Sequence, residues 1–454
     1  MIDTFRKFIN SSRYQIKTIS IIYLLTIIAI QSALSQDSIS SLPNISFSIG
    51  GEFKSRFEVR NGYRTLAPDD TSVAIFGNMR TRLNFDFKSP HVNAFISIQD
   101  ARVYGEYSGQ FRGGSINLFE GYAEVPLGKG FSAKVGRQRI MYDNQRLFAQ
   151  NDWRVWARAH DAVRFNLVKE KSDLSTVVAF NQSGENYFGT TYNPLSSLAS
   201  EDYKLLHIVA LTQKLGHGFT LFILHAADGF ESTLANENKH LRMRYTDGGR
   251  LEWINKNKKI YITTNAYIQY GKTTSNQKIL AWYAQPEIKI SAIKNITMRI
   301  GAEFLSGQDV ENTRNTRYNS FVPLYGVAHR FNGYMDLFTR FPVDTKNAGL
   351  LNPYLFVEYT LNSKISFSDN AHYFASHHHL IDSGNKIPRS LGFENDVLFT
   401  YKPNKIIGLE LGYSFVLPTT SLEYIKNTDT HKFNQWAYIQ LTVKPDFFTF
   451  THKK

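Results

Sequence analysis

Four basic residues are concentrated in one stretch of the chain, "KVGRQRIMYDNQRLFAQNDW" (134–153). They are Lys134, Arg137, Arg139 and Arg146. An arginine guanidinium stays protonated and offers a planar fork of donors that matches a carboxylate in bidentate fashion. Successive side chains of an extended chain alternate in direction, so Arg137 and Arg139 should project together. These residue types predict a binding site for carboxylates.

Polar and apolar residues alternate in other segments of the chain. The clearest are "EFKSRFEVR" (52–60), "MRTRLNFDF" (79–87), "DAVRFNLV" (161–168) and "LRMRY" (241–245). In each of them charged or amide side chains occupy every second position, and mostly apolar side chains occupy the positions between them. A period of two is typical of a β-strand whose faces meet different surroundings.

The polar faces of these strands are expected to point into water. An arginine facing lipid near the bilayer midplane costs roughly 2–4 kcal/mol, and several such costs would exceed a typical folding stability of about 5–15 kcal/mol. A dry core would require every charge to be paired. We therefore expect a water-filled lumen, whose basic lining favours anions and repels cations.

The same lining has a less specific interpretation. Arginines can shape the field across a pore while they pair with neighbours such as Asp86, Asp143 or Asp161. The alternation therefore leaves a channel for polyanions and a general anion-preferring porin both open.

The N-terminus has the pattern of an export signal. Basic residues between Arg6 and Lys17 precede the apolar run 19–30, and Ala33 and Ser35 occupy the −3 and −1 positions of a cleavage site. The apolar run is shorter than the roughly 20 residues that span a bilayer as a helix. We expect residues 1–35 to be a secretory signal peptide and residues 36–454 to form the mature protein.

Composition excludes several classes of protein. The chain has 454 residues, a formal net charge of +13 and no cysteine, so disulfides, thiolate catalysis and cysteine-ligated metals are excluded. No segment after the signal approaches 18 consecutive apolar residues, which excludes a helical membrane protein. A transmembrane barrel is compatible with the mean hydropathy of −0.31, and 34 Phe and 25 Tyr suit its aromatic girdles.

Short turns and long polar segments separate the strand-like runs. Turns are expected at 126–131, 214–219 and 401–406, and long loops at 61–75, 184–203, 226–240 and 306–325. Bacterial barrels have periplasmic turns and longer external loops, and the mature length allows roughly 16–20 strands. The predicted fold is all-β, a single transmembrane antiparallel β-barrel domain of the outer membrane. Two segments depart from this pattern, namely "FISIQDARVYGEY" (95–107), where the phase changes, and the C-terminal "THKK".

No catalytic or cofactor-binding constellation is evident. "GYAEVPLGKG" (121–130) lacks the spacing of a phosphate loop and is expected to form a hairpin turn. The run His377–His379 lacks a second group of metal ligands, and "APDDTS" (67–72) lacks a full oxygen cage for Ca²⁺. Basic residues are spread over strand faces rather than clustered, which argues against nucleic acid.

The arginine-rich stretch, followed by "RAHDAVRF" (158–165), resembles the alginate export family of outer-membrane barrels. "RFEVRNGY" (56–63), "GAEFLSGQDV" (301–310), "LYGVAHRFNGYMDLF" (324–338) and "NAGLLNPYLFVEY" (347–359) agree with it in order and spacing. The resemblance implies a monomeric 18-stranded barrel whose electropositive constriction passes a polyuronate. It places Arg56, Arg60, Arg137, Arg139, Arg146 and Arg164 on matching motifs, with Asp143 and Asp161 as lumen acids between them. Arg80 and Arg82 join this set of predicted pore-lining residues through the alternation alone.

The predicted function is an outer-membrane channel, not an enzyme, for anionic saccharides such as alginate or for organic anions, in either direction. Its expected surroundings are outer-membrane lipid and, in addition, periplasmic or surface accessory proteins. One alternative is a surface carbohydrate-binding β-protein. Another is a barrel enzyme, which would need a serine beside a histidine such as His160 or His207, and no serine has a recognisable nucleophile setting.

Overall fold

The computed structural model describes residues 44–106, 116–192, 202–234, 240–311 and 316–452. The predicted signal peptide, residues 1–35, lies outside the described residues. No helix within the described part of the chain has the length and apolar character to cross a membrane.

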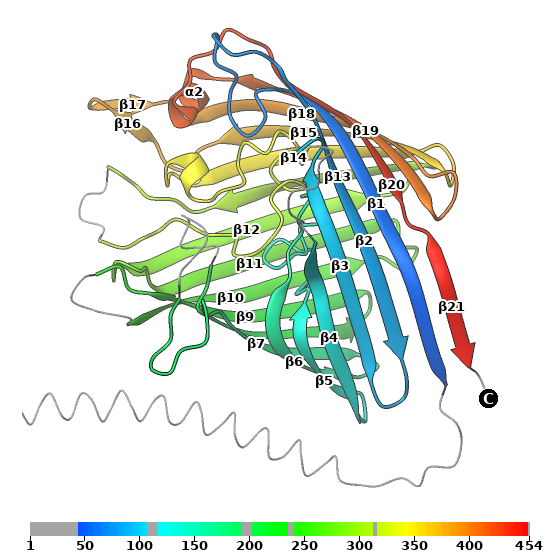
Figure 1. Cartoon of the computed structure of the whole chain (residues 1–454). Helices are drawn as coiled ribbons and strands as arrows, with labels where there is room; N and C mark the ends of the chain where they lie inside the picture. The colour runs from blue at the N-terminus through cyan, green and yellow to red at the C-terminus, as the bar shows by residue number, and fades with distance from the viewer. Residues whose placement is uncertain (1–43, 107–115, 193–201, 235–239, 312–315, 453–454) are drawn as a thin grey trace, which may run out of the picture.

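The described strands form a closed antiparallel barrel of 18 strands, as predicted (Figure 1). Each strand pairs with its neighbours in sequence, and β1 closes the barrel by pairing with both β2 and the last strand. That last strand is divided at Pro445 into β20 and β21, which both pair with β1. The barrel strands are β1 (Ile45–Asn61), β2 (Ala74–Lys88), β3 (Asn93–Val103), β4 (Asn117–Gly128), β5 (Phe131–Gln138), β6 (His160–Val168), β7 (Ser172–Phe180), β8 (Leu205–Gly216), β9 (Phe219–Glu231), β10 (Leu241–Ile254), β11 (Ile260–Lys272), β12 (Lys278–Ile290), β13 (Ile296–Leu305), β14 (Leu350–Thr360), β15 (Ile365–Ala375), β18 (Ser390–Tyr401), β19 (Ile407–Pro418), β20 (Asn434–Val443) and β21 (Asp446–His452).

The predicted alternation of faces is confirmed on β1. Phe53 and Phe57 are 44% and 50% exposed on the outer face, whereas Glu52 and Arg56 are only 6% and 4% exposed on the inner face. Exposed apolar side chains recur on the outer face of the other strands, as a lipid-facing surface requires.

The two departures from the pattern have local explanations. On β3, Ile96, Ile98 and Arg102 share the outer face, and Arg102 Nε lies 3.0 Å from Asp100 Oδ2. The phase does not reset against β2, so the charged end of the strand is the end next to a loop, beyond the apolar band. At the C-terminus, β21 continues past Phe450 to His452, so "TH" still belongs to the barrel.

Some strands escape prediction because their patterns are mixed. β15 reads "ISFSDNAHYFA", in which the buried inner face carries His372 and Phe374, an imidazole and an apolar ring. β10 runs without a break through Gly248 and Gly249, well beyond the predicted segment 241–245. Small elements that are not barrel strands are η1 (Val343–Thr345), the hairpin β16 (Leu380–Asp382) with β17 (Asn385–Ile387), and helix α2 (Thr420–Lys426).

Two long loops fold into the barrel and build its core (Figure 1). The 139–159 loop joins β5 to β6, and the 306–349 loop joins β13 to β14. Phe148 of the first loop and Met335 and Phe338 of the second have no exposed surface. Both loops lie at the end of the barrel opposite the short turns, which is the external end in bacterial barrels.

Candidate functional site

The two inward loops cross and bind each other through their backbones. Tyr325 N–H donates to Leu147 O at 2.9 Å, and Ala149 N–H donates to Tyr325 O at 3.2 Å. Gly326 makes this approach possible, because a Cβ atom there would lie 1.8 Å from the carbonyl oxygen of Arg146. The loops therefore form one unit that narrows the lumen.

Asp152 attaches the 139–159 loop to the barrel wall. Its carboxylate lies 3.0 Å from Arg80 and 3.0 Å from Arg82, both on β2, and 3.4 Å from Lys54 Nζ on β1. Arg80 also donates to the backbone carbonyl of Arg154. Burial opposes ionisation of Asp152, but these three cations outweigh it and hold the pKa of the carboxyl well below its usual range.

Arg146 makes a second attachment, deep in the barrel. Its Nε donates to Glu303 Oε1 on β13 at 2.7 Å, and its Nη1 donates to Val327 O in the other loop. Tyr283 donates its hydroxyl hydrogen to the same carboxylate oxygen at 2.5 Å. Arg146 and Glu303 are almost fully buried, so each charge depends on the other for its stability.

The 306–349 loop is fixed mainly by acids of the wall. Tyr325 donates to Asp228 on β9 at 2.8 Å, and Met335 N–H donates to Glu394 on β18 at 2.7 Å. Asp336, an acid of the loop itself, accepts from Tyr63 of the 62–73 loop at 2.5 Å. In each of these contacts a buried carboxylate accepts the hydrogen bond, so these carboxylates hold the loop in place.

Aromatic stacking joins both loops to the wall. The Trp153 ring lies parallel to the His329 ring, with centroids 3.9 Å apart, and contacts Trp436 of β20 edge-on at 5.6 Å. The Arg56 guanidinium lies 4.1 Å above the Trp153 ring. Stacking of this kind fixes the loops in one position.

Most of the predicted pore-lining residues face inward, where neighbouring side chains engage them. Arg56 and Arg60 both pair with Glu58, at 2.9 and 2.7 Å. Asp143 lies 2.7 Å from Arg250 on β10. Arg164 faces the lumen and donates to Asn166 and Ser175. Arg80, Arg82 and Arg146 hold the 139–159 loop as described above.

Arg137 and Asp161 are not lumen residues, which corrects the expectation for both. They face each other across β5 and β6 and form an ion pair of 3.1 Å on the outer surface. The residues of β5 that face the lumen are Lys134, Gly136 and Gln138. Arg139 follows the end of β5, where the alternation stops, and pairs instead with Glu120 at 2.8 Å. Arg137 and Arg139 would share a face only if the strand continued through both residues. Because β5 ends at Gln138, they do not.

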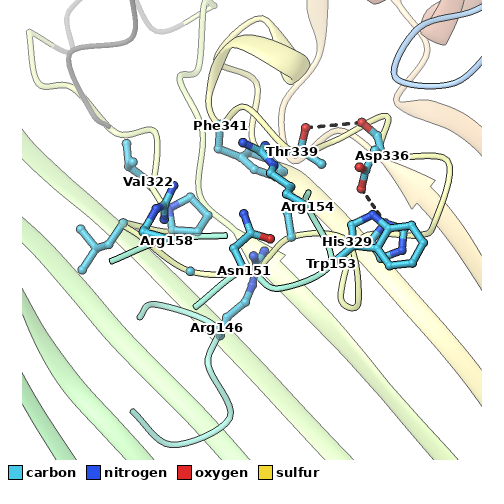
Figure 2. Close-up of a pocket in the computed structure, with 14 residues that line it drawn as sticks. Arg146, Asn151, Trp153, Arg154, Arg158, Val322, His329, Asp336, Thr339 and Phe341 are labelled. Atoms are coloured by element: carbon cyan, nitrogen blue, oxygen red, sulfur yellow. Dashed lines mark hydrogen bonds and ion pairs between the residues drawn. The ribbon is translucent and has the colours of Figure 1, made fainter. Parts of the chain in front are cut away.

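The loops supply cations that the sequence did not single out. Figure 2 shows Arg154 and Arg158 beside a cavity between the two loops, with Arg146 at its base. Asp336 is the one acid among the residues that line this cavity, and it already binds His329 at 2.8 Å and Tyr63. Arg154 makes no ion pair with any described residue. Only the density of arginines in "NDWRVWARA" signalled this cluster, and nothing in that stretch showed that the loop enters the barrel.

A second cationic group lines the lumen on the side of the short turns. Arg299, Arg330 and Lys402 line one cavity there together with Glu358, and Lys54 and Lys444 line an adjoining one together with Glu410. Arg299 pairs with Glu287 at 2.6 Å and Lys444 with Glu52 at 3.1 Å. Arg330 donates to the backbone carbonyl of Asn144. Burial, together with the nearby charge of Arg299, lowers the pKa of Arg330.

The described residues contain no cluster of three or more His or acidic side chains that could hold a metal ion. Within the His377–His379 run, His377 contacts the Trp282 ring and His379 faces the carbonyl oxygen of Ile387. His160 is buried, and its Nδ1 lies 2.8 Å from the Tyr203 hydroxyl.

Solved structures of outer-membrane porins share this fold. OpdK of Pseudomonas aeruginosa, solved with vanillate, aligns with a TM-score of 0.59 at 9% identity over 89% of this chain and 99% of its own. OccAB4 of Acinetobacter baumannii aligns with 0.57 at 11% identity over 89% and 98%. A BenF-like porin of Pseudomonas fluorescens Pf-5 aligns with 0.59 at 9% identity over 88% and 99%.

Among curated proteins no sequence matches this chain. The alginate export family matches residues 46–419, which include every barrel strand from β2 to β19 and both inward loops. With the porin fold and the constricting loops, this match places the chain in the outer membrane as a channel: it belongs to the alginate export family.

Proposed function

We propose that the channel passes anionic solutes that carry carboxylates, either anionic saccharides such as polyuronates or smaller organic anions. The observation that carries this proposal is the cavity beside Arg154 and Arg158. Three arginines, Arg146, Arg154 and Arg158, line it against one acid, Asp336, so positive charges outnumber negative ones in the lining. A cationic constriction lowers the barrier for anions and raises it for cations.

A carboxylate that enters from the loop side meets Arg154 and Arg158 first. Beyond the crossed loops it reaches Arg330, Arg299 and Lys402. Two groups of cations on either side of the narrowing give an anion successive sites, each able to release it to the next. Because both sides are basic, the arrangement serves export and uptake equally.

The family and the fold neighbours support carboxylates from two directions. The family is named for the export of alginate, a polyuronate, and the structure of OpdK was solved with vanillate, an aromatic carboxylate. The two ligands differ in size but share the group that a guanidinium recognises. The proposal therefore covers both large and small carboxylates, and the blocking experiments below distinguish them.

Reversal potentials in planar bilayers test the proposal. Arg154→Gln/Arg158→Gln is expected to lower the anion-to-cation permeability ratio by about threefold, because two positive charges leave the lining of the cavity between the loops. Arg137→Gln is the matched control: it removes an arginine from the outer surface and is expected to leave the ratio unchanged. A wild-type channel that prefers cations would overturn the proposal.

Blocking experiments then define the solute. Uronate oligomers and an aromatic monocarboxylate are added separately to wild-type channels. Block by the oligomers that weakens in the double variant identifies a saccharide channel. Anion preference without block by either compound identifies a general anion-preferring porin.

We also propose that the channel acts as a monomer, because one barrel encloses a complete lumen. Light scattering of the protein in detergent is expected to give a single chain per particle.

A further inference from the structure

The short turns at one rim of the barrel carry an unusual concentration of lysine. Eight turns connect the strands at this rim, at 89–92, 129–130, 169–171, 217–218, 255–259, 291–295, 361–364 and 402–406. They contain ten lysines and one acid, Glu170. The ten are Lys129, Lys169, Lys171, Lys256, Lys258, Lys259, Lys294, Lys364, Lys402 and Lys405, and the two turns without a lysine adjoin Lys88 and Lys214.

The opposite rim has no such excess. Among the described residues of the long loops, basic and acidic side chains are equal in number, fourteen of each. The turn lysines are all exposed, and none of them makes an ion pair with a described residue. The charge of this rim is therefore not neutralised by a described acid. Lys402 and Lys405 also line the lumen cavities at this rim, whereas the other eight lysines line none of them.

Apolar side chains accompany the lysines. Ile293, Leu361 and Ile406 lie within the same turns and are 60%, 47% and 44% exposed. Exposed apolar groups beside free ammonium groups suit the boundary between acyl chains and head groups, where a lysine stem lies along apolar surface and its ammonium reaches the phosphates. A soluble partner would leave these apolar groups uncovered around most of the rim.

The distribution points the same way. The lysines occur in six of the eight turns, and so around the whole barrel rather than in one sector. A docked protein contacts a sector, whereas lipid surrounds the circumference. We propose that this lysine ring binds the head groups of anionic phospholipids in the periplasmic leaflet, such as phosphatidylglycerol. The proposal is independent of the solute that the channel passes.

Native mass spectrometry of the full-length barrel tests the proposal. The protein is released from micelles that contain equal amounts of phosphatidylglycerol and phosphatidylcholine, and the lipids retained on each barrel are counted. Lys256→Gln/Lys258→Gln/Lys259→Gln changes one turn that lines none of the lumen cavities described above. It is expected to reduce the association constant for phosphatidylglycerol by about fivefold and to leave phosphatidylcholine unchanged.

Lys346→Gln/Lys386→Gln/Lys432→Gln is the control, because it removes the same charge from the other rim. It should retain phosphatidylglycerol as the wild type does. Heat-modifiable gel mobility confirms that each variant is folded, and an unchanged reversal potential separates lipid binding from ion selectivity. Equal retention in all three proteins would overturn the proposal. A turn variant that still retains phosphatidylglycerol but no longer binds soluble polyglutamate would also overturn the proposal, because the lysine ring would then bind an acidic protein.

Discussion

The Oδ1 atom of Asp152 lies 3.0 Å from Nη1 of Arg82, across the lumen side of β2. Arg80, two residues earlier on the same strand, reaches the same carboxylate. Strand arginines that looked like free pore cations therefore hold a loop in place. The cavity between the two loops is lined instead by arginines of that loop, Arg146, Arg154 and Arg158.

Removing the Asp152 charge should release the 139–159 loop. Asp152→Asn leaves Lys54, Arg80 and Arg82 with one fewer acid, and loss of one member of a largely buried charge cluster costs about 3 kcal/mol. We expect a larger single-channel conductance than in the wild type. Asp70→Asn, which changes an exposed acid in the 62–73 loop, should behave as the wild type. Unchanged conductance in Asp152→Asn would show that other contacts hold the loop.

The same attachment predicts a pH dependence. The pKa of Asp152 is held well below its ordinary value, near 3.9 in an unfolded chain. Because folding lowers this pKa, the ionised carboxylate stabilises the attachment fully at any pH above the ordinary value. The stabilisation is lost only as the pH falls through the lower pKa of the folded state. Conductance should therefore stay constant from pH 7 to about pH 4 and rise only in stronger acid. Asp152→Asn should start high and lack this rise.

The Arg146–Glu303 pair should show strong coupling. Arg146→Leu leaves Glu303 charged and buried, which costs about 3–5 kcal/mol. The double variant Arg146→Leu/Glu303→Leu removes both charges and should be more stable than either single variant. Thermal unfolding followed by gel mobility measures the cycle. Additive losses would mean that the two side chains contribute independently.

The loop crossing should not tolerate a side chain at position 326. A Cβ in Gly326→Ala would lie 1.8 Å from Arg146 O, so the two loops must separate. We expect higher conductance and faster tryptic cleavage within 139–159. Gly184→Ala is the control, since a Cβ there meets no atom within 4 Å. Equal protease resistance in both variants would contradict the close approach.

The amino-acid sequence by itself determined the barrel. The alternation on β1 and β2 can be satisfied only where one face meets lipid and the other does not, because an arginine in the bilayer is too costly. Local parity therefore assigned Arg56, Arg80 and Arg82 to the inner face, and the structure agrees. The strand β15 was missed because Asp369 lies on its outer face and Phe374 on its inner face, and these two residues interrupt the period of two.

Only the tertiary structure decided what the arginines do. Whether Arg82 meets a solute or Asp152 depends on the path of a loop 70 residues away in sequence, and no local pattern encodes that path. Parity also failed at Arg137, because the direction of a strand residue depends on register with its neighbours β4 and β6. Phe148, Trp153 and Phe338 pack against the hydrophobic core inside the barrel. Because this packing holds the 139–159 loop inside the barrel, Arg154 and Arg158 line the cavity between the two loops.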